Sequence, residues 1–348
     1  ARVWNVERLE IYDSGAVPLV AAFYSYPFGG EKQTGCGMSR LTVAICSYNR
    51  AYRLHNLVTA LRAQKCPVPF EILIVDNNCT DNTQQVVQEL SKLNGVPLRY
   101  VKERQQGIVY ARNRAIEETK NSTYLSYIDD DEFPCPNWLK VAVDALEREG
   151  ADCVGGEIRV SLPFTRRLPW LEDELLGFLG AVNYSSGPFW ITEHHTPIWS
   201  GNIAYKTSIF ADGLRFDSRY NREGLSIGGG EDAIMFYTLI ERGMRIRYRP
   251  DMAIQHFVEE SKLKRRYFLK LHFISGQKFG QYADGKYKRT IFGVPPFMLI
   301  QAAHQWNRAL LKFLKHESGA LRQSMNGAYA TGMIVGRIQR WKDNDQNV

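Results

Sequence analysis

The six cysteines of this sequence stand singly, and no CxxC pair occurs among them. That absence argues against a zinc ribbon and a compact disulfide framework, and it makes a reducing cytoplasm the simplest setting. No run reaches the ~18 uninterrupted apolar residues of a membrane-spanning helix, and the N-terminus lacks the order of a signal peptide. No recognisable nucleic-acid-binding module occurs either, so we expect no nucleic acid among the partners.

The charged residues are distributed unevenly along the chain. From Glu259 to Val348 there are 16 Lys+Arg against 6 Asp+Glu, which is +10, whereas the preceding 258 residues carry 28 against 31, which is −3. The body is therefore nearly neutral and the C-terminal region is basic. At 348 residues, with 44% hydrophobic content, the chain is long enough to bury a sizeable core.

Three regions are expected from composition and periodicity. Residues 1–37 are rich in Gly, Pro and aromatics without sustained periodicity, so we predict a loosely attached extension. Met38 would open the folded domain, residues 38–258. Residues 259–348 would form a basic helical region.

Within residues 38–258 the pattern alternates between strands and helices. Strands are predicted at 41–46, 70–75, 98–101 and 124–128, and the helices between them at 54–61, 83–93 and 108–119. This alternation predicts an α/β fold with a mainly parallel sheet and right-handed crossovers. Ligands of such sheets bind beyond the carboxyl ends of the strands, where polar clusters occur at 47–49, 76–81 and 129–131.

Four consecutive acids, Asp129, Asp130, Asp131 and Glu132, follow the fourth predicted strand, and Pro134 and Pro136 are expected to stop that strand. Adjacent carboxylates repel one another unless they are neutralised, and a divalent cation held by oxygen ligands is the natural partner. Such a cation suits a phosphorylated ligand. A solvated acidic turn is the alternative.

A second acidic pair follows a glycine turn in Gly228-Gly-Gly-Glu-Asp-Ala-Ile-Met235. The turn places Glu231 and Asp232 just before a helix predicted over 233–242. One reading is a carboxylate general base, and the other is a helix cap worth about 0.3–1 kcal/mol.

Several ordered segments together resemble an inverting family 2 glycosyltransferase of GT-A fold, of the bacterial polysaccharide-assembly type. The segments are TVAICSYNR, EILIVDNNCTDNT, GIVYARNRAI, YLSYIDDDEFPCPNWL and GGGEDAIMFYTLIERG. The resemblance covers roughly Met38 to His256 and implies a sugar donor activated as a nucleotide diphosphate, with Mg²⁺ or Mn²⁺ as cofactor.

The resemblance also implies roles for particular residues. Nucleotide-binding positions map onto Cys46, Tyr48, Asn49, Asp76, Gly107, Arg112, Asp129 and Asp130. The DxD motif maps onto Asp129 and Asp131, with His256 as a further metal ligand, and Asp232 is the catalytic base with Glu231 beside it. Trp199, Gly201 and Asn202 match the turn that approaches the donor sugar and acceptor. Asn77 departs from the family pattern, which often has a second Asp there, so the sequence leaves the nucleotide base open.

The basic C-terminal region contains an amphipathic pattern. Leu299, Trp306, Leu310 and Phe313 line one face of a predicted helix, and Arg308 and Lys312 belong to the other face. This pattern is typical of a helix that lies on an anionic membrane, although a helix packed on the catalytic domain would show it too.

Together these features predict an enzyme that moves a sugar, with inversion, from a nucleotide-sugar to a glycan or polyprenyl-linked acceptor. We expect a cytoplasmic protein, peripheral on the inner face of the cell membrane. A nucleotidyltransferase acting on a sugar phosphate is the alternative enzyme, and a non-catalytic glycan- or membrane-binding scaffold is the alternative without chemistry.

Overall fold

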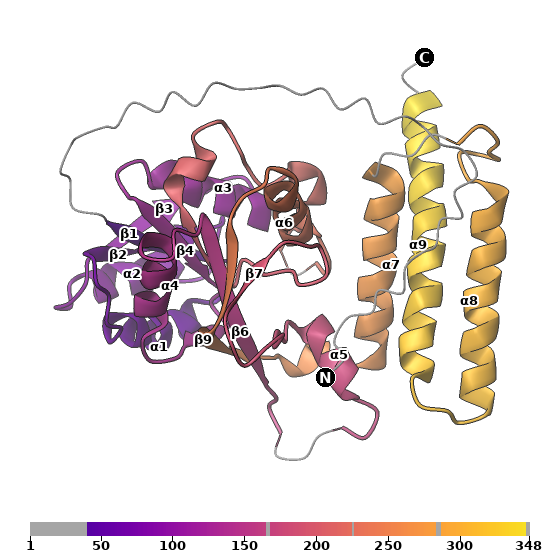
Figure 1. The fold of residues 1–348 in the computed structure, drawn as a ribbon, viewed down its shortest axis with the longest axis horizontal. Coiled ribbons are helices and arrows are strands. Elements are labelled where there is room, and N and C mark those ends of the chain that lie inside the picture. The colour runs from indigo at the N-terminus through magenta and orange to yellow at the C-terminus, as the bar shows by residue number, and fades with distance from the viewer. Residues whose placement is uncertain (1–39, 165–167, 225, 283–286, 346–348) are drawn as a thin grey trace.

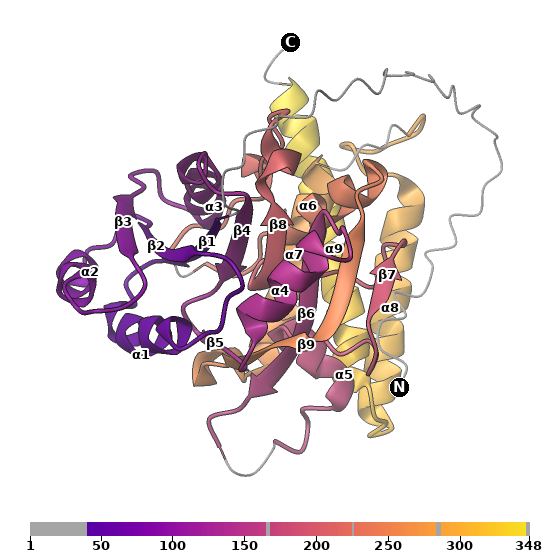
Figure 2. The same cartoon turned by 60° about the vertical axis from the view of Figure 1, so that its left-hand side comes forward.

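The computed structural model describes residues 40–164, 168–224, 226–282 and 287–345. Within them one nine-stranded sheet forms the centre, with the order β3-β2-β1-β4-β8-β6-β9-β5 and β7 paired to β9. Figure 2 shows this order from β3 to β9 across the molecule. The expected extension, residues 1–37, and the boundary at Met38 lie outside the described residues.

The first half of the sheet is parallel, as the alternating pattern predicts. Its strands and helices are β1 (Leu41–Ser47), α1 (Ala51–Arg62), β2 (Phe70–Asp76), α2 (Thr83–Ser91), β3 (Leu98–Lys102), α3 (Ile108–Glu118) and β4 (Tyr124–Ile128). β1 pairs in parallel with both β2 and β4, and β2 pairs in parallel with β3. α1 and α2 pack together, whereas α3 packs against β1 and β2. The right-handed crossover rule places α3 on the opposite face from α1 and α2.

The second half of the sheet contains both parallel and antiparallel strand pairs. Its elements are α4 (Trp138–Glu147), β6 (Cys153–Ser161), α5 (Asp173–Leu176), β7 (Phe189–Ile191), β8 (Asn202–Lys206), α6 (Glu231–Glu241) and β9 (Ile246–Phe257). β8 runs antiparallel between β4 and β6, and β6 pairs in parallel with β9. β9 therefore runs in the same direction as β4, and its end at His256 lies at the same edge of the sheet as the acids.

The chain after β4 forms a short strand that the sequence did not predict. β4 ends at Ile128, as expected, and Glu132–Pro134 then forms a separate strand, β5, which pairs antiparallel with the end of β9. β5 is the last strand of the sheet, where a proline without an N–H is tolerated. The pairing sets Glu132 opposite His256 and so joins two predicted parts of the site.

The core follows the apolar periodicity of the strands. β1, β2 and β4 are buried on both faces because helices cover the sheet, and Trp138 of α4 is fully buried against β8. The indole N–H of Trp138 donates to the side-chain oxygen of Asn202 over 2.8 Å. The five described cysteines are all free thiols, as expected for a chain without a disulfide framework.

The C-terminal region is helical, as predicted, and consists of α7 (Arg265–Tyr282), α8 (Pro296–Leu314) and α9 (Ala320–Asp345). The three helices stand side by side, with α9 between the other two and α8 farthest from the sheet (Figure 1). None of the described helices has both the length and the apolar content needed to cross a bilayer.

Candidate active site

Three strand ends bring the predicted nucleotide and acidic residues to one edge of the sheet. β1 ends beside Cys46, β2 ends at Asp76, and β4 ends immediately before Asp129. These strands are parallel, so their carboxyl ends lie together. Desolvation raises the pKa of the Cys46 thiol to about 12, which keeps the thiol neutral.

The three consecutive aspartates differ in burial, and the two buried ones share Arg50 as a partner. Asp130 accepts a hydrogen bond from the Ser47 hydroxyl at 2.9 Å and pairs with the Arg50 guanidinium at 2.7 Å. Asp131 is also buried and lies 3.3 Å from Arg50. Asp129 is the most exposed of the three, with 36% of its side chain accessible. Asp129 is therefore the member of the three that a bound molecule can reach most easily.

Burial and charge separate the pKa values of the two buried aspartates. Burial raises the pKa of Asp130 to about 6, and the neighbouring Asp131 adds to that rise, while Arg50 opposes it. The pKa of Asp131 is instead held below its usual range despite burial, because His256, Lys262 and Arg50 stabilise its charge. Asp130 therefore takes up a proton at a higher pH than Asp131 does.

Arg112 connects the aspartates to the second acidic motif. Its guanidinium, buried on α3, donates to Glu231 at 3.0 Å and to Asp232 at 2.6 Å, and it lies 3.7 Å from Asp129. Two motifs about a hundred residues apart in the sequence therefore share one cation. This contact forms the centre of the candidate site.

Glu231 and Asp232 begin α6 and differ in exposure. The helix starts at Glu231, two residues earlier than predicted, after Gly230 with a positive φ of 98°. The Glu231 side chain is 8% exposed and that of Asp232 is 23% exposed. Burial and the adjacent Asp232 raise the pKa of Glu231, although Arg112 opposes the rise. Asp232 is therefore the carboxylate of this pair that a bound molecule can reach more easily.

The turns after β1 and β2 are built by the predicted nucleotide residues themselves. Asn49 accepts hydrogen bonds from the backbone of Thr80 (2.7 Å) and Asp81 (3.3 Å). Asp76 accepts from the Tyr100 hydroxyl at 2.7 Å and from the backbone N–H of Cys79 at 2.7 Å. These bonds hold the two turns together.

Tyr48 lies half-buried beside these turns, next to Gly224. Asn77, the departure from the family pattern, is buried and holds the loop before α3. Its amide donates to the carbonyl of Gln105 at 2.8 Å, and its oxygen accepts from the N–H of Gly107 at 2.8 Å. The structure thus uses the Asn77 side chain to fix a loop.

The turn before β8 places its three predicted residues differently. Trp199 is half-buried beside the core, and a Cβ at Gly201 would lie 2.4 Å from a carboxylate oxygen of Glu132. The close approach that glycine permits here is therefore made to Glu132. Asn202 points into the sheet, where it binds Trp138 and donates to the carbonyls of Glu157 and Met252. The side chain of Asn202 holds the sheet together and does not join the acids.

His256 and Asp131 face each other and offer a nitrogen and an oxygen donor. His256 Nε2 lies 3.7 Å from Asp131 Oδ2, and His256 Nδ1 is buried without a hydrogen-bond partner in the described part of the chain. No group of three His, Cys, Asp or Glu side chains among the described residues forms a complete metal site. The donor set fits a divalent cation whose remaining ligands come from a bound phosphate ligand.

Sequence reasoning missed five residues of this site: Arg50, Arg53, Ser200, Glu259 and Lys262. Arg53 and Lys262 lie 3.8 and 3.6 Å from Asp131, and Arg50 and Arg53 both pair with Glu259. The Ser200 hydroxyl donates to Asp232 at 2.5 Å. The signal for Arg50 was its place directly after a strand-end turn, but nothing in the sequence showed that residues 259–262 fold back over the acids.

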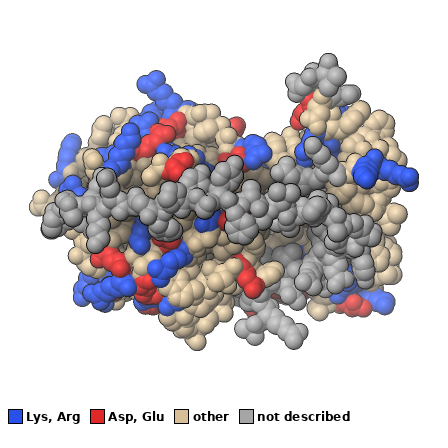
Figure 3. Space-filling model, turned by 45° about the horizontal axis from the view of Figure 1, so that its top comes forward, with Lys and Arg blue, Asp and Glu red and all other residues tan. Residues whose placement is uncertain are grey.

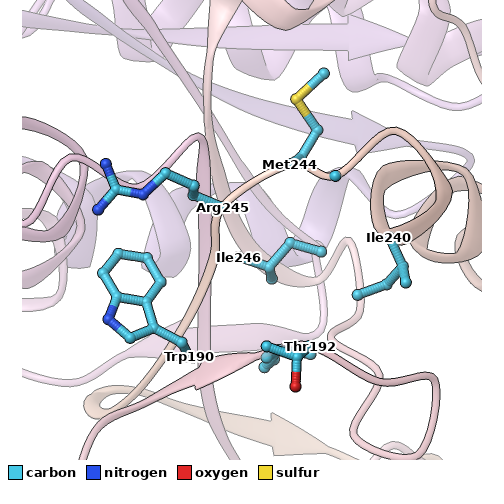
Figure 4. A pocket seen from close by; sticks show the side chains of 8 residues that line it. Trp190, Thr192, Ile240, Met244, Arg245 and Ile246 are labelled. Carbon is cyan, nitrogen blue, oxygen red and sulfur yellow. The ribbon is translucent and has the colours of Figure 1, made fainter. Parts of the chain in front are cut away.

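A cavity of about 440 Å³ lies elsewhere on the sheet, lined by Trp190, Ile240, Met244, Arg245 and Ile246 among others (Figure 4). It is at the beginning of β9, whereas His256 lies near the end of that strand, on the order of 30 Å farther along an extended chain. The cavity lining includes no acid. It is therefore separate from the candidate active site.

The fold and the acid-lined strand ends define a protein of the GT-A glycosyltransferase fold. The mannosyltransferase PcManGT from Pyrobaculum calidifontis, solved with GDP-Man and Mn²⁺, superimposes with a TM-score of 0.56 at 17% identity, over 87% of this chain and 88% of that one. GalNAc-T7, solved with UDP, GalNAc and Mn²⁺, superimposes with a TM-score of 0.52 at 14% identity, over 72% and 49%. Identities this low establish the fold alone.

Residues 42–214 match the family described as glycosyl transferase family 2. Glycosyltransferase AglE of Haloferax volcanii is 30% identical over 124 residues, which cover 35% of this chain and 40% of that protein. Succinoglycan biosynthesis protein ExoM of Rhizobium meliloti is 26% identical over 252 residues, 69% of this chain and 74% of that protein. The match to AglE thus spans less than half the length of that protein, whereas the match to ExoM spans about three quarters of it. Asp232 and His256 lie beyond the segment that matches the family.

Proposed function

We propose that this protein transfers a sugar, with inversion, from a nucleotide-diphosphate sugar to the hydroxyl of a glycan or polyprenyl-linked acceptor. The observation that carries the proposal is the contact of Arg112 with Asp232 at 2.6 Å and Asp129 at 3.7 Å. It brings an accessible carboxylate next to the acids of the strand-end motif. The family match favours this activity over the alternative of nucleotidyl transfer.

Asp232 is the proposed general base. Arg112 and Ser200 both bind its Oδ1, which leaves Oδ2 for the proton of the acceptor hydroxyl. As that proton moves to Asp232, the acceptor oxygen attacks the anomeric carbon from the face opposite the leaving group. The bond between the sugar and the diphosphate breaks, and the nucleotide diphosphate departs. Glu231 is the less suitable base because it is buried.

Asp129, Asp131 and His256 are the proposed ligands of Mg²⁺ or Mn²⁺. Such an ion, when bound, acts as a Lewis acid for the departing diphosphate. Asp131 suits this role because its charge is stabilised at neutral pH. The turns held by Asn49 and Asp76, together with Tyr48, Cys46 and Gly107, would hold the base and ribose, as expected from the resemblance.

The names of the relatives suggest a biological role and candidate sugar donors. ExoM is named for succinoglycan biosynthesis, and PcManGT was solved with GDP-Man. We therefore propose a role in polysaccharide assembly and choose GDP-, UDP- and dTDP-linked sugars as the donors to screen. Thermal-shift measurements with Mn²⁺ would rank these donors before turnover is measured.

Nucleotide release from the best donor tests the base. Asp232→Asn keeps the shape and the Arg112 contact but cannot accept a proton, so turnover should fall roughly 10²–10⁴-fold while nucleotide binding persists. Glu231→Gln is the matched comparison and should lower turnover far less. Near-normal turnover of Asp232→Asn would disprove the assignment, and a larger loss in Glu231→Gln would transfer the role to Glu231.

We also propose that the protein is cytoplasmic and binds the inner face of the cell membrane through α8. The helix packs on α9 through Met298, Ala302 and Ala309 and through the Trp306 indole, which donates to the Thr331 hydroxyl at 3.0 Å. Leu299, Leu310 and Phe313 of its predicted apolar face are left exposed. Eight large apolar residues of α8 are exposed: Phe297, Leu299, Ile300, Trp306, Leu310, Leu311, Phe313 and Leu314. Figure 3 shows the right-hand end of the molecule, where α8 lies in Figure 1, as a largely uncharged surface with both basic and acidic residues at its margin.

The charge around α8 favours an anionic lipid surface over a second copy of the chain. Residues 287–316 contain five Lys and Arg (Lys288, Arg289, Arg308, Lys312 and Lys315) and no Asp or Glu. Two such surfaces would repel each other, whereas anionic lipid attracts basic residues by about 1 kcal/mol each.

Flotation with vesicles containing anionic or only neutral lipid tests this docking. The wild type should float with the anionic vesicles at low salt and less at high salt, because charges are screened beyond about 8 Å at physiological ionic strength. Leu310→Ser with Phe313→Ser should abolish flotation. Leu93→Ser, at an equally exposed leucine of the catalytic domain, should leave it unchanged. A wild type that stays unbound at low salt would show that the face serves another contact.

A further inference from the structure

The helix that carries Arg112 takes its N-terminal cap from a distant loop. α3 begins after Gly107, which has no side chain to cap the free N–H groups of the first turn. The N–H of Ile108 donates to the carbonyl of Arg222 at 3.0 Å, and the N–H of Val109 donates to the side-chain oxygen of Asn221 at 3.2 Å. Residues 221–222 therefore supply the cap.

The fit of Asn221 against this turn explains Gly107. A Cβ at Gly107 would lie 2.1–2.4 Å from the side-chain atoms of Asn221, and Gly107 has a φ of 139°, which other residues rarely adopt. The Asn221 amide also donates to the carbonyl of Gln106 at 3.4 Å. Asn221 is therefore packed directly onto the start of α3.

α7 holds the loop that contains Asn221. The Lys278 ammonium donates to the carbonyl of Asn221 at 2.6 Å, and Tyr282 packs edge to face on Tyr220 with ring centres 5.6 Å apart. Ile274 lies against Gly228, where an added Cβ would come within 2.8 Å of it. Ile274, Lys278 and Tyr282 are spaced four residues apart and so share one face of α7.

α7 is in turn fixed against α9 by close backbone contacts. Cβ atoms added at Gly276 and Gly280 would lie 2.1 and 2.2 Å from the carbonyl oxygens of Tyr329 and Met333. The loop that α7 supports continues through Gly228 and Gly230 to Asp232. One segment therefore leads from the cap of α3 to the carboxylate at the start of α6.

We propose that Asn221 and Lys278 are positioning residues, which hold Arg112 and Asp232 in the relative positions that the transfer reaction needs. Arg112 follows Gly107 by five residues, about 7.5 Å along the helix, so a shift of the cap moves the guanidinium. A misplacement of about 1 Å in a catalytic group can cost about 10²-fold in rate. This inference rests on the proposed function.

Asn221→Ala tests the cap because it removes both side-chain hydrogen bonds. Its turnover with the best donor should fall roughly 10- to 100-fold, with a change of less than about threefold in donor KM. Asn221→Asp keeps an oxygen for the N–H of Val109 and suits a helix N-terminus, so it should restore turnover to within about threefold of the wild type. A loss shared equally by Ala and Asp would overturn the role of the cap, as would an unchanged turnover in Ala.

Lys278→Met keeps the apolar stem, removes the donor to Asn221, and should lower turnover about 3- to 10-fold, a fraction of the cap effect. Lys270→Met is the control, because Lys270 lies exposed on the same helix. Equal turnover in the two Lys variants would remove Lys278 from the proposal.

Hydrogen exchange of the peptide that spans residues 104–112 separates this inference from the proposed function, since it needs no substrate. Asn221→Ala should speed its exchange about 2- to 30-fold, the range expected for a lost cap, and Lys270→Met should not. Unchanged exchange in Asn221→Ala would overturn the inference. If no donor were turned over by the wild type, the proposed function would fail while the exchange result still decided whether the cap is real.

Discussion

The parallel half of the sheet and the C-terminal helices use their apolar residues in different ways. Val43, Ala44 and Ile45 of β1 are completely buried, whereas Ile300 and Phe313 of α8 are 71% and 64% exposed. β1 is a continuous apolar run that helices cover on both faces, whereas α8 is a helix with α9 on one side only. The sequence therefore shows where apolar residues occur, and only the neighbouring elements decide whether they become core or surface.

Charge shows the same contrast. In the α/β region, acids and bases meet inside the protein, as Arg112 does with Glu231 and Asp232. The charged residues of segment 287–316 are all basic, and most of these basic side chains are exposed. Removal of a charge should therefore matter greatly in the first region and little in the second.

The largest effect is expected for Arg112→Met. Loss of the guanidinium leaves buried carboxylates without a counter-charge, which typically costs about 3–5 kcal/mol. The free energy of unfolding, measured by urea denaturation, should fall by that amount. Adding Glu231→Gln should recover part of it, because one buried charge is then also gone. A loss below about 1 kcal/mol would contradict the view that these charges depend on Arg112.

An intermediate effect, dependent on pH, is expected at the junction of the two regions. His272 of α7 packs on Phe178, and burial lowers the pKa of His272 from 6.5 to about 4, with nearby Arg322 adding to the shift. The folded protein thus binds this proton less readily than the unfolded chain. The resulting stability is complete above about pH 6.5 and is lost as the pH falls toward 4, by up to about 3 kcal/mol.

His272→Phe keeps a ring beside Phe178 and removes the titration. Denaturation at pH 7 and pH 4.5 should therefore show a smaller loss of stability in the variant than in the wild type. Equal losses would mean that His272 has the same pKa in the folded and unfolded states.

The smallest effect is expected on α8 itself. Phe313→Ala should change the free energy of unfolding by no more than about 0.5 kcal/mol, since the ring is already in solvent. Phe268→Ala, at a fully buried phenylalanine of α7, should cost about 3–5 kcal/mol. Thermal and urea unfolding of both variants measure the difference. A costly Phe313→Ala would show that α8 packs against another part of the protein.

Much of the α/β region could be predicted from the sequence because its signals are local. The four parallel strands, the helices between them and the acids at the end of β4 all follow from short segments. β5 was missed because a three-residue edge strand that ends in proline has almost no local signal. The cations around Asp131 were missed because Arg50, Arg53 and Lys262 come from two parts of the chain separated by about two hundred residues.

The sequence by itself determined the order of strands and helices, the family resemblance and the basic character of the C-terminal region. Only the tertiary structure decided that Asn202 serves the sheet, that Asn221 caps α3, and that the apolar face of α8 stays outside. The physical reason is the difference in the sequence separation over which these interactions act. Periodicity and turn chemistry act over a few residues, whereas burial and ion pairing depend on which distant segments the folded chain brings together.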